Sequence, residues 1–109
     1  MNITDPDTIL QRIKAQAAAD DLVLTLHAVE EMQDENVVLE EVLAAIVNGV
    51  LLENYPTFYK GPCCLVGGLG NRGRYLHVVC STSRPKLFII TVYEPKPPKW
   101  ITPNERGEQ

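Results

Sequence analysis

The sequence lacks the features that mark membrane and exported proteins. Its longest apolar run, LFIITV, is far shorter than the roughly 20 residues that a helix needs to cross a bilayer. Its first residues, MNITDPDTIL, contain no basic segment followed by an apolar one, so no secretory signal is expected. We therefore expect a cytoplasmic protein that does not associate with membranes.

Cysteine is scarce, and its spacing is not that of a metal site. The three cysteines are Cys63, Cys64 and Cys80. No two of them have the two-residue gap that lets neighbouring ligands converge on zinc, and an odd number cannot all pair in disulfides. We expect neither a metal nor a cofactor. Two interpretations stay open: small buried hydrophobes in a reducing compartment, or a thiol nucleophile that His27 or His77 approaches in space.

The chain also lacks internal repeats and low-complexity segments. Its 109 residues are 45% hydrophobic and 22% charged, which predicts one domain over residues 1–109 with a core of its own. The net charge of −4 is unevenly distributed, with −9 over residues 1–59 and +5 over residues 60–109. This balance argues against tight, sequence-blind binding to nucleic acid, but it leaves room for a local basic face.

What is present in the first half is helical periodicity. A helix is predicted to begin at Pro6, with Asp5 or Asp7 as its cap. Its apolar residues recur at helical spacing up to the alanine-rich stretch. Residues 22–25, LVLT, then form a short extended segment that leads into the next helix.

Two further helices are predicted before residue 50. Thr25 caps the second, which carries HAVEEM and stops at Asn36. The third spans about residues 39–48 and has one apolar stripe. Gly49 is expected to end it in the left-handed conformation, and Glu41 is expected on its solvent face.

The second half changes to strand periodicity. Four strands are predicted, at residues 50–55, 63–68, 74–80 and 86–93. The short links between them favour consecutive antiparallel pairing in a meander. The predicted fold class is therefore α+β, with N-terminal helices packed on one face of a four-stranded antiparallel meander sheet.

Strand alternation predicts which side chains face away from the helices. Leu76, Val78, Cys80, Phe88, Ile90 and Val92 are expected inside. The outward face is then expected to gather Glu53, Tyr55, Tyr75, His77, Val79, Ile89, Thr91 and Tyr93. Basic residues at the strand ends, Arg72, Arg74, Arg84 and Lys86, are expected to border it.

Four segments together resemble a known family. They are HAVEEM at residues 27–32, VLEEVLAAIVNGVLLENYP at 38–56, YLHVV at 75–79 and IITVYEPKPPKW at 89–100. Their order resembles the domain-of-unknown-function 4258 (DUF4258) family of small bacterial and archaeal proteins. The likeness runs over residues 22–106, which leaves residues 1–21 as an N-terminal helical extension. One position departs from it, because many relatives have an arginine where this chain has Glu31.

The resemblance implies a function. The family looks like a branch of the RelE and MqsR type of toxin, so a RelE/MqsR-like fold and a metal-independent endoribonuclease are the expectation. The implied partners are RNA, bound weakly or on a ribosome, and a zinc-finger antitoxin of the MqsA (YgiT) type. Glu31 removes one ligand for phosphate. The alternative is a non-catalytic protein-binding domain that has kept the scaffold, and an uncovered sheet edge would allow a homodimer.

Metal-free cleavage of RNA needs a base, an acid and a cation. His77 is the predicted acid or base, Tyr93 on the neighbouring strand its partner, and His27 a third catalytic residue. Arg74 is the predicted phosphate ligand. Tyr75 and Tyr55 are expected to stack on a base, and Thr91 is grouped with them as substrate-binding.

Overall fold

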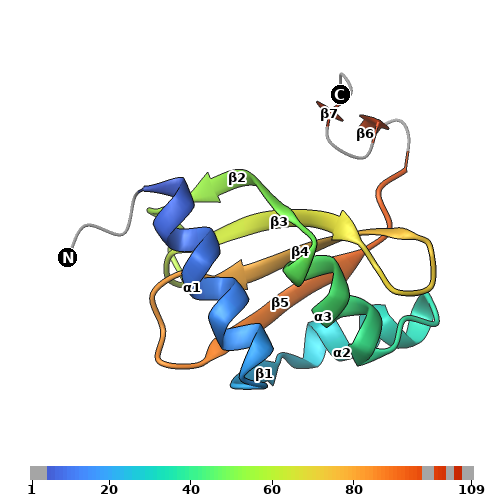
Figure 1. Ribbon diagram of the computed structural model, residues 1–109, viewed down its shortest axis with the longest axis horizontal. Helices are drawn as coiled ribbons and strands as arrows, with labels where there is room; N and C mark the ends of the chain where they lie inside the picture. Colours follow the sequence, from blue (N-terminus) through green and yellow to red (C-terminus); the bar gives the residue numbers. More distant parts are fainter. Residues whose placement is uncertain (1–4, 97–99, 103–104, 107–109) are drawn as a thin grey trace.

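The computed structural model describes residues 5–96, 100–102 and 105–106 (Figure 1). Its helices are α1 (Pro6–Ala18), α2 (Leu26–Asp34) and α3 (Leu39–Val47). Its strands are β1 (Leu22–Leu24), β2 (Val50–Tyr55), β3 (Cys63–Leu69), β4 (Tyr75–Ser81), β5 (Leu87–Tyr93), β6 (Trp100–Thr102) and β7 (Glu105–Arg106). Of the helices in this part of the chain, none has the length and apolar character to span a membrane.

The main sheet has five strands in the order β1-β5-β4-β3-β2, and β6 pairs with β7 separately. Strands β2 to β5 pair consecutively and antiparallel, as predicted. The expected four-stranded meander is nevertheless wrong in one respect, because β1 joins β5 in parallel and makes the sheet mixed. Three residues are too few for strand alternation to show, which is why this strand looked like a plain extended segment.

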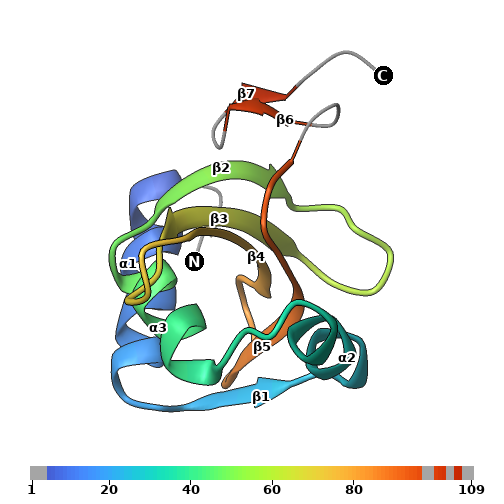
Figure 2. The same ribbon diagram turned by 90° about the vertical axis from the view of Figure 1, so that its right-hand side faces the viewer.

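The helices cover one face and one edge of the sheet (Figure 2). Helices α1 and α3 pack on the same face, where Ile9, Ile13 and Ile46 are fully buried among the inward strand residues. The side chain of Asp5 caps α1 by accepting from the Thr8 amide, and Thr25 caps α2 by accepting from the Ala28 amide.

Helix α2 lies along β5 where β1 stops. The Thr25 amide bonds to the Ile89 carbonyl (3.0 Å), continuing the pairing of β1. One turn apart on α2, the Glu31 carboxylate then accepts from the Val92 amide (2.9 Å) and Glu35 accepts from the Glu94 amide (3.3 Å). Two carboxylates thus take the place of a neighbouring strand and satisfy one edge amide of β5 and the amide of Glu94 just beyond it.

A bulge in β5 corrects the predicted alternation. Val79 lies opposite Thr91, but Cys80 lies opposite Ile89, so Ile90 is an extra residue on its strand. Val92 is inside, as predicted. Beyond the bulge the faces exchange, and Ile89 is buried in the core while Ile90 is only half-buried.

The reason for a glycine at position 49 also differs from the prediction. Gly49 is not among the described residues with positive φ, and Asn48 ends α3 in the right-handed region. A Cβ on Gly49 would lie 2.5 Å from the Ala45 carbonyl oxygen, and one on Gly68 would lie 1.9 Å from the same atom. Both positions lack a side chain because α3 and β3 approach each other closely.

Candidate functional site

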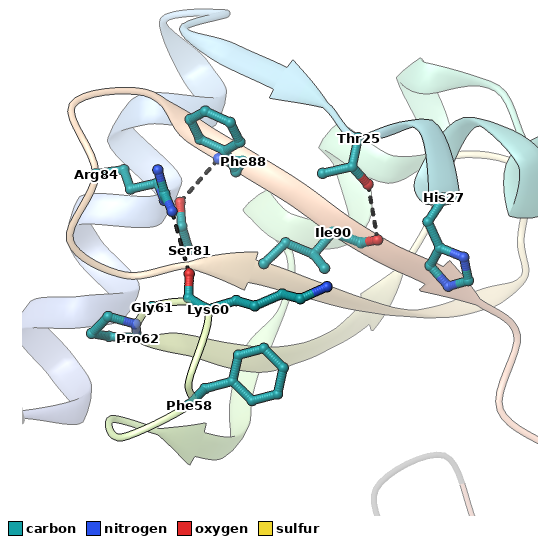
Figure 3. Close-up of a pocket in the computed structure, with 10 residues that line it drawn as sticks. All are labelled: Thr25, His27, Phe58, Lys60, Gly61, Pro62, Ser81, Arg84, Phe88 and Ile90. Carbon is teal, nitrogen blue, oxygen red and sulfur yellow. Dashed lines mark hydrogen bonds between the residues drawn. The ribbon is translucent and has the colours of Figure 1, made fainter.

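A pocket opens on the face of the sheet away from α1 and α3 (Figure 3). Phe88 and Ile90 form part of it, alternating along β5 with the core residues Leu87 and Ile89. The cavity measures about 380 Å³. Its lining residues are Thr25, His27, Phe58, Lys60, Gly61, Pro62, Ser81, Arg84, Phe88 and Ile90.

The pocket forms where two loops meet the start of α2. The loop between β2 and β3 contributes Phe58 and Lys60, and the loop between β4 and β5 contributes Arg84. Both loops lie at the same end of the sheet because alternate turns of a meander share an end. Thr25 donates to the Ile90 carbonyl (3.1 Å), which fixes the start of α2 against β5.

Helix α1 fixes the loop between β4 and β5 in place. Arg12 donates to the carbonyls of Thr82 and Arg84, both at 2.7 Å. Gln16 donates to the carbonyls of Arg84 and Pro85, both at 3.1 Å. These four bonds fix the backbone from which the Arg84 side chain projects.

The lining residues carry positive charge and no carboxylate. Lys60 and Arg84 are cationic, and His27 gains a charge when it is protonated. The Arg84 guanidinium lies over the Phe88 ring, 4.9 Å from its centroid, and donates to the Lys60 carbonyl (3.3 Å). In Figure 3 the Lys60 side chain extends across the pocket in the direction of His27. The pocket is therefore suited to an anionic ligand.

His27 is oriented by its own helix. Its Nε2 lies 3.4 Å from Oε1 of Glu31, one turn further along α2. The same carboxylate oxygen accepts from the Val92 amide, so the sheet fixes the group that holds the imidazole. We expect Nε2 to carry the proton beside Glu31, which makes Nδ1 the proton acceptor. Glu31, expected only to remove a phosphate ligand, thus positions a histidine at the pocket.

The structure brings His77 and Tyr93 together, as predicted. They are opposite each other on β4 and β5, and His77 Nδ1 lies 3.1 Å from the Tyr93 hydroxyl. Their rings meet edge to face, with centroids 5.2 Å apart, and the Tyr75 ring centroid lies 6.1 Å from that of His77. The expected exposure of His77 is wrong, because its relative exposure is 0%. This pair lies outside the pocket lining.

Arg74 does not join that pair. It alternates with Tyr75 at the start of β4, so it points to the helical side of the sheet, away from His77. Its Nε and Nη2 both donate to the Glu41 carboxylate at 3.0 Å. Its guanidinium also donates to the backbone carbonyls of Glu35 (2.9 Å) and Asn36 (2.6 Å). The predicted meeting of an imidazole, a phenol and this guanidinium is therefore wrong, because Arg74 is bound between α2 and α3.

Glu41 corrects a second expectation, since it is fully buried instead of solvent-facing. The hydrogen bonds from Arg74 hold the pKa of the Glu41 carboxyl below its usual value of 4.5, although burial acts in the opposite direction. The same contact raises the pKa of Arg74. Both groups are charged at neutral pH and serve the fold.

The remaining predicted ligands are placed outside the pocket lining. Tyr55 donates its hydroxyl to Glu53 on the same strand. Thr91 is half-buried opposite Val79. Strand alternation predicted this face of the sheet. It did not predict Phe58, Lys60 and Phe88 as residues of the site, and it predicted Arg84 only at the border of the face. One signal in the sequence could have found them. In a meander, the loop between β2 and β3, which Pro56 and Pro62 bound, and the loop between β4 and β5 lie at the same end of the sheet.

The three thiols are buried, and none of them forms a disulfide. Cys64 and Cys80 lie opposite each other on β3 and β4. A hydrogen bond with Cys64, and then burial, raise the pKa of Cys80 well above its usual value, and burial raises the pKa of Cys63. In the described residues, no three His, Cys, Asp or Glu side chains gather where they could hold a metal ion.

We expect the folded protein to resist iodoacetamide at neutral pH, because thiols with raised pKa values and little exposure react slowly. Mass spectrometry should detect no adduct in the native state and three adducts in denaturant. Rapid modification of any one thiol in the native protein would restore the interpretation of a cysteine nucleophile.

Comparison with known proteins supports the predicted resemblance. A family model described as "Domain of unknown function (DUF4258)" matches residues 24–94. No curated protein and no solved structure matches the chain. The match begins at the end of β1 and ends just after β5, so it includes α2, α3 and the whole meander. With well over half of its residues matched, the chain belongs to the DUF4258 family.

Proposed function

We propose that this protein is a metal-independent endoribonuclease whose active site is the pocket at the start of α2. One observation carries the proposal: an exposed, carboxylate-oriented His27 shares a cavity with Lys60 and Arg84, and the lining contains no acidic residue. A base that shares a cavity with two cations supplies the kinds of group that cleavage by the 2′-hydroxyl of RNA requires.

In the proposed reaction, His27 Nδ1 takes the proton of the 2′-hydroxyl and the 2′-oxygen attacks the adjacent phosphorus. The bond from phosphorus to the 5′-oxygen breaks. That oxygen leaves with a proton from the Lys60 ammonium or from water. Lys60 and Arg84 stabilise the charge on the phosphorane-like transition state. The products are a 2′,3′-cyclic phosphate and a free 5′-hydroxyl.

The toxin role is part of the same proposal. It rests on the resemblance of the sequence to RelE and MqsR toxins, together with a meander sheet that helices cover on one face. The proposed partners are RNA, bound weakly or on a ribosome, and a zinc-finger antitoxin of the MqsA (YgiT) type. Catalytic roles for His77 and Tyr93 stay a prediction.

The test is to incubate the full chain with RNA in excess EDTA and to map both ends at each cut. We expect cleavage that leaves 2′,3′-cyclic phosphate and 5′-hydroxyl ends. An oligonucleotide with a single 2′-deoxy sugar on the 5′ side of the cut should stay intact at that bond, because the attacking hydroxyl is gone. Cleavage of the deoxy substrate, or loss of activity in EDTA that added metal restores, would contradict the mechanism.

A second function is favoured by exposed apolar side chains beside the pocket. Leu26 is 73% and Tyr59 83% exposed, and each is next in sequence to pocket-lining residues. Such side chains are typical anchors of a protein interface. A non-catalytic binding domain would cut no RNA in the assay above. It would bind a partner that Leu26→Ser and Tyr59→Ser weaken.

A further inference from the structure

We infer that the pocket holds one unpaired nucleotide with its base against Phe58, so that the substrate is single-stranded RNA. The inference rests on the proposed function, since it names the form of RNA that the same pocket takes. Three observations support it: the size of the cavity, the placement of its rings and the position of its charges.

The cavity is small. Its volume of about 380 Å³ is near the lower end of the roughly 300–1,000 Å³ of typical ligand pockets. One nucleotide is a ligand of that class. A paired base cannot enter alone, because its partner strand occupies its Watson–Crick edge. Entry therefore requires a base that is already unpaired, or one that leaves its duplex at a cost of a few kcal/mol.

The two phenylalanines are not equivalent. Figure 3 shows Phe58 and Phe88 on opposite sides of the pocket. The Arg84 guanidinium already lies over Phe88, 4.9 Å from the ring centroid. Phe58 is 42% exposed and projects from a loop, so its ring offers the available stacking surface. A base on Phe58 also faces the cationic side of the pocket, since Lys60 extends between the two rings.

The charges place the sugar and phosphate. Lys60 follows Phe58 by two residues on the same loop, and its side chain extends in the direction of His27. A base against Phe58 therefore has its phosphate near the Lys60 ammonium and its ribose near the imidazole. Base–aromatic stacking tolerates any base, because every base has a π-face. We accordingly expect selection for unpaired RNA over paired RNA, with little selection by sequence.

The test measures binding by fluorescence anisotropy to a labelled 2′-O-methyl RNA oligonucleotide, which has no 2′-hydroxyl to react. The unmodified full chain should bind the single strand at least about tenfold more tightly than the same strand annealed to its complement. Phe58→Ala should weaken single-strand binding about 5- to 150-fold, the range for loss of one stacked base. Phe58→Leu should weaken it too, and Phe58→Tyr should restore it, because only a flat ring stacks.

Thr57→Ala is the matched control. Thr57 precedes Phe58 on the same loop, is exposed and is not part of the pocket lining. Its replacement should leave binding within about twofold. Equal affinity for single and double strands, or equal losses in Phe58→Ala and Thr57→Ala, would overturn the inference. If the protein binds single strands selectively but cleaves no RNA, only the proposed nuclease function is contradicted. If it cleaves duplexes as fast as single strands, only this inference is contradicted.

Discussion

Replacing Arg74 with methionine is expected to lower the free energy of unfolding by about 3–5 kcal/mol. The Glu41 side chain has no exposed surface, and both of its oxygens accept from Arg74 at 3.0 Å. Without Arg74, a carboxylate stays buried with no counter-ion. The loop between α2 and α3 also loses its contacts to the carbonyls of Glu35 and Asn36. Urea unfolding followed by circular dichroism measures the change.

Lys96→Met is the matched control, because it removes a positive charge from an exposed residue outside the contacts of Glu41. It should change stability by no more than about 0.5 kcal/mol. The double variant Glu41→Leu with Arg74→Met should recover much of the loss, since an apolar pair leaves no buried charge. A loss below about 1 kcal/mol in Arg74→Met would mean that the pair does not hold α2 and α3 in place.

The stability from this pair should also depend on pH. The pKa of Glu41 is lower in the folded protein than its usual 4.5, so the unfolded chain binds the proton more readily in acid. The contribution is complete above the usual pKa and is lost as the pH falls through the folded value. The gap in stability between the unmodified chain and Arg74→Met should therefore narrow in acid.

The second large effect is expected at His27. If the proposed function holds, His27→Ala should lower the rate of RNA cleavage by about 10²- to 10⁴-fold, the usual contribution of a positioned acid or base. The side chain is 64% exposed, so the fold should not depend on it. Glu30→Gln changes an exposed residue of the same helix and should leave the rate within about twofold. Quantitative end mapping gives both rates.

Tyr93→Phe separates the two candidate catalytic centres. It removes the hydroxyl that contacts His77 Nδ1 and leaves the pocket intact. If Tyr93→Phe still cleaves RNA and His27→Ala does not, the chemistry belongs to the pocket. If His27→Ala still cleaves RNA and Tyr93→Phe does not, the chemistry belongs to the buried His77, and the proposed site is contradicted.

Local patterns predicted much of this fold, and contacts between distant residues account for what they missed. Caps at Asp5 and Thr25 depend on a few neighbouring residues, so both were predictable. Strand alternation placed Val92 correctly and failed at Ile89, because a bulge follows from pairing across strands. Glu41 looked like a surface residue because its counter-ion is 33 residues away in sequence.

The candidate site shows the same division. His27 was predicted from the sequence, and the structure places it at the pocket. The contact of His77 with Tyr93 was predicted from alternation, but its burial was not. Lys60 and Arg84 come from two loops, and only the topology of the meander brings loops from such distant positions together.

The carboxylates of α2 have a consequence for the behaviour of the protein at high concentration. Strand β5, LFIITVY, combines high β-propensity with no charge, proline or glycine, which is the composition of a fibril-forming segment. Glu31 occupies the Val92 amide of this strand and Glu35 occupies the Glu94 amide just beyond it, so another molecule cannot add there as a strand while α2 is docked. We therefore expect transient detachment of this one helix, well short of global unfolding, to expose this edge of β5 and to promote aggregation.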